Sequence, residues 1–146
     1  MSPEPGAPLI FVAEDEPQIL ELIVTRVEQA GYRTAHARNG WEAWDGIRAL
    51  RPDGVLLDIN MGGMDGFAVL RTVRAHARTR DIPVLMLTAR GGLEDVSHAI
   101  DLGAQDYLTK PFDERVLLQR LARLVRRREP PPPLAPPPDA DDIVLL

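Results

Sequence analysis

The amino-acid sequence predicts an α/β fold built around a parallel sheet. Five short apolar runs alternate strictly with segments of helical periodicity, which is the pattern of successive β-α-β units. Four of these runs lead directly into polar residues. Because ligands of open parallel sheets bind beyond the carboxyl ends of the strands, the sequence also predicts a polar site at that edge of the sheet.

Several predicted elements have a local signal at one boundary. Pro17 fits the first turn of a helix, where its missing N–H costs nothing, and Gly31 and Gly103 each end a helix. The turn at residues 52–54 precedes the third strand, and Pro83 precedes the fourth. In chain order we predict a strand at residues 9–13, a helix at 17–30, a weaker strand at 33–37, a helix at 40–50, a strand at 55–58, a helix at 67–76, a strand at 84–88, a helix at 92–102, a strand at 106–109 and a helix at 113–128.

The composition is that of a globular protein with one domain. The chain has 146 residues, 45% hydrophobic and 27% charged, and no apolar run approaches the roughly 20 residues of a membrane span. Because it has no cysteine, it has neither a disulfide framework nor a thiolate metal site. The first eight residues lack the basic start and apolar core of a signal peptide, so we expect a cytoplasmic protein.

The charge pattern argues against a nucleic-acid surface. The formal net charge is -5, and no aromatic residues interleave with the arginine stripe of the third helix and the loop after it, which comprises Arg71, Arg74, Arg78 and Arg80. We therefore predict that this stripe is a solvated helix face, and we expect no direct contact with nucleic acid.

The sequence divides into three parts. Residues 1–7 are predicted to be a disordered N-terminus and residues 8–128 a folded domain. Residues 129–146 are predicted to be a flexible tail, because seven of the 14 prolines lie between positions 130 and 138. The tail ends with acidic residues and then the apolar residues 143–146, which are either a frayed end or a docking motif for a partner groove.

The polar strand ends supply a chemically specific set of groups. Glu14 and Asp15 follow the first strand, Asp58 ends the third, Thr88 ends the fourth, and Lys110 follows the fifth. Lys110 is the only lysine in a chain with 17 basic residues, and an ammonium is a compact point charge that fits beside a carboxylate and a metal ion. Carboxylates beside one hydroxyl and one ammonium suit a magnesium-bound phosphoryl group.

These strand ends resemble those of the receiver domain of two-component response regulators, through Glu14-Asp15, Asp58, Thr88-Ala89 and Lys110-Pro111. Residues 103–112 also resemble the last-strand signature of that family. The resemblance covers about residues 8–128. It implies a flavodoxin-like, doubly wound (βα)5 fold, with the strand order 2-1-3-4-5 in a three-layer sandwich.

The resemblance implies that Asp58 is the phosphoacceptor. A carboxylate at that position can attack phosphorus in line and form an aspartyl phosphate. Because crowded carboxylates repel one another, a cation must compensate their charge. The implied cofactor is Mg²⁺, held by Asp15, by Asp58, by the backbone carbonyl of Asn60 and, through a water molecule, by Glu14.

The resemblance also implies roles for the last two strand ends. Lys110 would neutralise charge on the phosphoryl oxygens, and the Thr88 hydroxyl would hydrogen-bond another of them. A cis peptide bond is implied between Lys110 and Pro111, where proline lowers its cost. Tyr107 matches the switch aromatic of the family, which moves inward when Thr88 moves toward the phosphoryl group.

The sequence departs from the family pattern at two surfaces. Gly62 occupies the loop after Asp58 where the family usually has proline, so we expect a looser loop. Asp106 and Arg120 could form a salt bridge on the dimer face of the DNA-binding subclass, but Gln105 and Val116 stand where charges are usual. We therefore expect a monomer or a weak dimer.

Together these features predict a stand-alone receiver that takes a phosphoryl group on Asp58 from a sensor histidine kinase or a phosphotransfer protein. A downstream protein partner would bind the face of the fourth helix, fifth strand and fifth helix, and we expect no turnover of an independent substrate. One alternative is an aspartate-dependent phosphohydrolase, which needs a second acid where Asn60 stands. Others are the receiver part of a longer DNA-binding regulator and a scaffold with a degenerate site.

Overall fold

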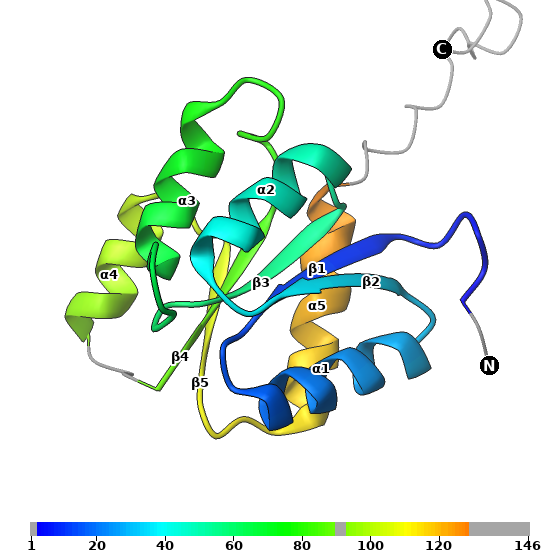
Figure 1. The fold of residues 1–146 in the computed structure, drawn as a ribbon. Coiled ribbons are helices and arrows are strands. Elements are labelled where there is room, and N and C mark those ends of the chain that lie inside the picture. Colours follow the sequence, from blue (N-terminus) through cyan, green and yellow to red (C-terminus); the bar gives the residue numbers. More distant parts are fainter. Residues whose placement is uncertain (1–2, 90–92, 129–146) are drawn as a thin grey trace, which may run out of the picture.

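The computed structural model describes residues 3–89 and 93–128, and its elements follow the predicted order, with bounds that differ by no more than one residue (Figure 1). The strands are β1 (Leu9–Ala13), β2 (Arg33–Ala37), β3 (Gly54–Asp58), β4 (Val84–Thr88) and β5 (Asp106–Thr109). The helices are α1 (Pro17–Gln29), α2 (Gly40–Leu50), α3 (Gly66–Ala75), α4 (Leu93–Asp101) and α5 (Glu114–Arg128).

The strands form one parallel sheet in the order β2-β1-β3-β4-β5, which confirms the order implied by the resemblance. The register sets Ala13 opposite Leu57 and Thr88 opposite Thr109. The strands therefore end at the same edge of the sheet, and the polar residues at and just after their ends lie along that edge.

Helices cover both faces of the sheet, which gives the expected three layers. Helices α1 and α5 cover one face, and α2, α3 and α4 cover the other (Figure 1). Strand residues alternate between the two apolar clusters, so Phe11 packs with the α2 and α3 side while Ile10 and Val12 pack with the α1 and α5 side. Strands β3 and β4 are buried throughout, and burying one such aliphatic side chain contributes about 1.5–3 kcal/mol.

Side-chain caps fix where two helices begin. The Asn39 side chain accepts a hydrogen bond of 2.9 Å from the backbone N–H of Glu42 and starts α2. In the same way Asp65 accepts one of 2.9 Å from Ala68, so α3 begins at Gly66.

The loop at residues 61–65 packs on the first turn of α2. A Cβ atom on Gly40 would overlap the carbonyl of Met64, and the Gly62 carbonyl accepts a 3.4 Å hydrogen bond from the Gly40 N–H. Gly63 has a φ of +73°, and a Cβ atom there would lie 2.8 Å from Cδ1 of Trp41. The loop therefore touches α2 through glycines, while the looser behaviour expected from Gly62 stays a prediction.

The prediction of a solvated arginine stripe is wrong for Arg74. Its half-buried guanidinium donates to the carbonyl of Gly103 at 2.7 and 3.0 Å and to that of Ile82 at 2.6 Å. It also donates to Oε1 of Gln105 at 2.8 Å. The side chain is buried because it ties the end of α3 to the segment that leads into β5. The other members of the stripe are exposed, as predicted: Arg71, Arg78 and Arg80.

Two predicted segments lie at the ends of the chain. The disorder expected for residues 1–7 stays a prediction. In the structure the Glu4 carbonyl accepts a hydrogen bond of 2.9 Å from the Ala7 N–H, and the Ala7 carbonyl accepts one of 2.8 Å from Arg33 of β2. The proline-rich tail, residues 129–146, lies outside the described residues. Among the helices of the described ranges, none has the length and apolar character needed to span a membrane.

The close packing of Gly66 leads to a first prediction. A Cβ atom there would overlap the Asp58 carbonyl and lie 2.7 Å from Cα of Ile59, so we expect Gly66→Ala to lower the free energy of unfolding by about 3 kcal/mol. Gly62 has no atom within 4 Å of such a Cβ, so Gly62→Ala is the matched control, with a change within about 0.5 kcal/mol. Urea denaturation measures both, and equal stabilities would contradict the described contact.

The hydrogen bonds of Arg74 lead to a second prediction. Arg74→Met leaves the carbonyls of Gly103 and Ile82 without their charged donor, so we expect a loss of about 3 kcal/mol in unfolding free energy. Arg71→Met, on the exposed face of the same helix, should change it by less than about 0.5 kcal/mol. A similar small effect of both substitutions would show that Arg74 is solvated after all.

Candidate functional site

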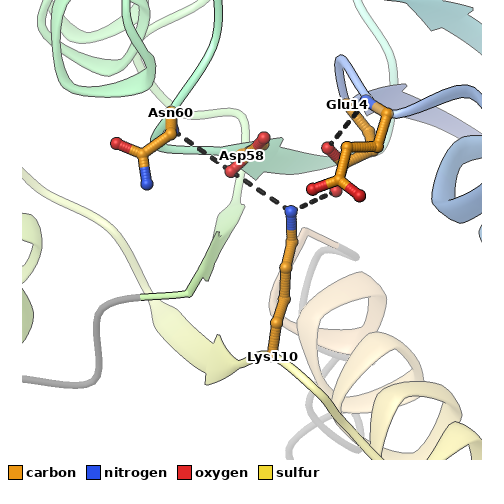
Figure 2. A network of polar contacts seen from close by, with 5 residues as sticks. Glu14, Asp58, Asn60 and Lys110 are labelled. Atoms are coloured by element: carbon orange, nitrogen blue, oxygen red, sulfur yellow. Dashed lines mark hydrogen bonds and ion pairs between the residues drawn. The ribbon is translucent and has the colours of Figure 1, made fainter.

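The polar residues predicted from the strand ends meet at the carboxyl edge of the sheet. Glu14 follows β1, Asp58 is the last residue of β3, and Lys110 follows β5. Figure 2 shows the Lys110 side chain reaching across the edge, with its ammonium between the carboxylates of Glu14 and Asp58. Side chains at the ends of three strands, at positions 14, 58 and 110, are thus in direct contact.

The contact among these three residues is a buried charge cluster. Lys110 Nζ forms an ion pair with Oε1 of Glu14, and a second one of 3.4 Å with Oδ1 of Asp58. The side chains of Glu14 and Asp58 are 0% and 2% exposed, and that of Lys110 is 11% exposed. One buried ammonium therefore faces two buried carboxylates, so the cluster has one more acidic group than it has bases.

The excess of acid changes the proton affinities of the cluster. Burial, with the hydrogen bond and charge of Glu14, raises the pKa of Asp58 to about 7. Burial also raises the pKa of Glu14, but its hydrogen bonds with Asp58 and Lys110 outweigh burial and hold that pKa below its ordinary value. Burial lowers the pKa of Lys110, but its hydrogen bond with Glu14 and the charges of both carboxylates raise it overall. Asp58 is therefore the member whose ionisation is disfavoured.

A second acidic group adjoins this cluster. Carboxylate oxygens of Glu14, Asp15 and Glu16 lie within 4.8 Å of one another, and the Glu16 N–H donates a 3.3 Å hydrogen bond to Oε2 of Glu14. Asp15 is half-buried, and Asp58 does not belong to this group of three. Glu16 was not among the predicted site residues, although the acidic run from residue 14 to residue 16 directly after a strand was the available signal.

The chemistry of these donors fits a hard divalent cation. Every side-chain donor is a carboxylate oxygen, which is the ligand type that Mg²⁺ prefers. Oε1 of Glu14 is fully buried, with the Lys110 ammonium against it. A bound cation would also compensate the second buried carboxylate, which the single ammonium leaves without a countercharge.

The remaining predicted residues flank the cluster. The Asn60 N–H donates a 3.1 Å hydrogen bond to Oδ1 of Asp58 and so orients that carboxylate, while the Asn60 side chain is exposed. Thr88 is 1% exposed at the end of β4, and its carbonyl accepts a 2.7 Å hydrogen bond from the Lys110 N–H. The peptide bond between Lys110 and Pro111 is cis, which is the geometry that the resemblance implied.

Tyr107 and its neighbours lie on β5. The Tyr107 side chain is half-buried, and its carbonyl accepts a 2.7 Å hydrogen bond from Arg120 of α5. Asp106 and Arg120, expected as a possible salt bridge on a dimer face, pair within this chain at 3.0 Å. The Gln105 side chain accepts hydrogen bonds from Arg74 and from the N–H of Val84, so it points into the domain.

Comparison with known proteins identifies relatives over most of the folded part. The family model of the response regulator receiver domain matches residues 10–122. The DNA-binding dual master transcriptional regulator RpaA of Synechocystis is 42% identical over 120 residues, which are 82% of this chain and 50% of that protein. The phosphate regulon transcriptional regulatory protein PhoB of Pseudomonas aeruginosa is 38% identical over 118 residues, which are 81% of this chain and 52% of that protein. The chain thus spans about half the length of these curated relatives.

Solved structures agree with this result. The receiver domain of Francisella response regulator 1452 superposes with a TM-score of 0.78 at 32% identity, over 84% of this chain and 99% of that one. The receiver domain of a Pseudomonas aeruginosa sensor histidine kinase superposes with a TM-score of 0.77 at 29% identity, over 83% of this chain and 99% of that one, and holds a magnesium ion in its active-site cleft. With the family match, the strand order and the strand-end residues in agreement, the chain belongs to the response regulator receiver domain family of two-component systems.

Proposed function

We propose that this receiver accepts a phosphoryl group on Asp58 from a sensor histidine kinase or a phosphotransfer protein. The observation that carries the proposal is the position of Asp58, a buried carboxylate at the end of β3 with the Lys110 ammonium 3.4 Å away. A carboxylate oriented by the Asn60 N–H and facing a fixed positive charge is suited to nucleophilic attack on a negatively charged phosphoryl group.

The transfer step changes no oxidation state and needs no redox partner. An Asp58 oxygen attacks phosphorus as the bond from phosphorus to the donor imidazole nitrogen breaks, and that nitrogen leaves with the electron pair and takes up a proton. Lys110 neutralises charge on the transferred group, and the hydroxyl of Thr88 contributes a hydrogen bond to one of its oxygens. These two residues bind and stabilise the group, and neither forms a covalent bond to it.

Mg²⁺ is the cofactor that this proposal assigns to the acidic residues. Asp15, Asp58 and the Asn60 carbonyl would hold it directly, and Glu14 would hold it through a water molecule. Its chemical contribution when bound is positive charge that offsets the crowded carboxylates and the phosphoryl oxygens. Support comes from the all-oxygen group of Glu14, Asp15 and Glu16 and from the magnesium ion in the Pseudomonas aeruginosa receiver structure.

The output of the proposed switch is a change in protein binding at the α4, β5 and α5 face. Inward movement of Thr88 and Tyr107 would alter this face, and α4 carries an apolar residue, Ile100, that is 55% exposed. A monomer or weak dimer in the cytoplasm, with no independent substrate turnover and no direct nucleic-acid contact, fits this role. The internal Asp106–Arg120 pair supports the monomer, because both charges are satisfied within one chain.

A second candidate is the receiver part of a longer DNA-binding regulator. It is favoured by the printed functions of RpaA and PhoB and by the match to only about half of each protein. The mass of the native polypeptide in its own cell distinguishes the two candidates: a mass matching the 146 residues supports the stand-alone receiver, and a larger one supports the regulator.

Replacing the proposed acceptor gives a direct test. Asp58→Asn keeps the side-chain shape but removes the nucleophile, so labelling by a phosphorylated donor protein in Mg²⁺ should fall to background. Asp45→Asn, an exposed carboxylate on α2, is the matched control and should label like the wild type. Phosphate transfer is measured with radiolabelled donor, and acid-stable labelling of Asp58→Asn would refute the assignment, whereas sustained release of phosphate from small esters would favour a phosphohydrolase.

The raised pKa of Asp58 gives a stability prediction. The native Asp58 carboxyl binds its proton more tightly than the unfolded one, because its pKa is about 7 instead of the ordinary 3.8. Its ionisation therefore lowers native stability as pH rises from 3.8 through about 7. Without divalent cations, Asp58→Asn should therefore be more stable than the wild type by about 2 kcal/mol at pH 8 and by much less at pH 4.

Denaturation at both pH values, with EDTA and with excess Mg²⁺, measures this difference. Magnesium should stabilise the wild type more than Asp58→Asn and so reduce the gap, because a bound cation stabilises the native state that binds it. A gap that is the same at pH 4 and pH 8 would show that Asp58 carries no unfavourable charge.

A further inference from the structure

A groove on the α2 and α3 side of the domain stands apart from the site. It has a volume of about 530 Å³, and we call it the α2–α3 groove. It is lined mainly by Trp41, Trp44, Arg48, His76, Arg78 and Thr79. We propose that residues 130–138, the proline-rich segment of this same chain, dock in the α2–α3 groove.

The aromatic lining of the groove carries the proposal. Trp41 and Trp44 are the only tryptophans of the chain, and their spacing of three places them on one face of α2. Trp41 is 63% exposed, and the Trp44 ring packs on the ring of His76 with centroids 4.7 Å apart. Together the two rings give the groove an aromatic surface, and burying such a surface under a partner is favourable.

An aromatic-lined groove of this kind is suited to binding proline. Pro-rich segments are already extended, so they lose little conformational entropy on binding, and their rings pack on aromatic-lined grooves. Proline has no N–H but keeps its carbonyl acceptor, which matches the donor-only N–H of an indole. Seven prolines stand between positions 130 and 138 of this chain.

Charge complementarity favours the same occupant. Arg48, Arg78 and Asp45 line the groove and all are exposed, so the two arginines leave it with a net positive charge. Arg48 pairs with Asp45 at 3.1 Å, but both side chains of that pair are more than half exposed, so the pair is weak. The proposed occupant is preceded by Glu129 and followed by three aspartates between positions 139 and 142.

The end of α5 lies close enough to the end of α2 for a nine-residue extended segment to reach the groove. A Cβ atom on Gly54 would lie 3.4 Å from the Leu124 side chain of α5, and Gly54 stands three residues after Arg51, which caps α2. The ends of α5 and α2 are thus at the same edge of the sheet (Figure 1). Nine residues in the polyproline conformation span about 28 Å, whereas the 11 residues of α2 span about 16 Å.

The two tryptophans allow a direct test in the full chain. Docking shields the indoles, so replacing the seven prolines at positions 130–138 with serine should increase acrylamide quenching of tryptophan fluorescence about twofold. Pro3→Ser with Pro5→Ser is the matched control outside the segment and should leave quenching unchanged. Arg48→Glu with Arg78→Glu should also increase quenching, by reversing the charge of the groove.

The remaining outcomes separate this proposal from its rivals. A synthetic peptide of residues 129–146, added to the serine variant, should restore the shielding. Equal quenching of the wild type and the serine variant would overturn the proposal. Shielding that grows with protein concentration would also overturn it, because the occupant would then be the segment of a second copy.

Discussion

The contact of Lys110 with two buried carboxylates is the constraint on which the site depends. Parallel strands bring Glu14 and Asp58 to one edge, where burial strengthens their repulsion. A single ammonium just after β5 compensates one of the two charges, so the second carboxylate stays costly, in agreement with the raised pKa of Asp58. The fold thus holds a destabilised carboxylate at the position of the proposed phosphoacceptor, and carboxylates with raised proton affinity are common at active sites.

The sequence predicted most of what short-range patterns control. Element order, helix bounds and the residues at the strand ends follow from apolar periodicity and turn signals, and the strand order followed from the family resemblance. The role of Arg74 was missed because its acceptors on Gly103 and Gln105 lie 29 and 31 residues away. A pattern within one helix shows which face is polar, but it does not show that another segment covers that face.

The tryptophan pair shows the same limit. Trp41 and Trp44 fit an ordinary helical pattern, and the groove that they line forms only when the residues after α3 pack beside α2. Trp41 also covers Gly63 in the loop that follows the β3 carboxylate. One indole therefore contacts both the α2–α3 groove and the loop that follows β3.

The scarcity of lysine has a consequence for the covalent chemistry of this protein. Lys110 carries the only side-chain primary amine, and it is largely enclosed and paired with acids. Acetylation, ubiquitin attachment and amine-directed crosslinkers have no other lysine to attack. The folded surface therefore offers no accessible lysine for such modification. Acylation of Lys110 itself would remove the positive charge at the centre of the cluster.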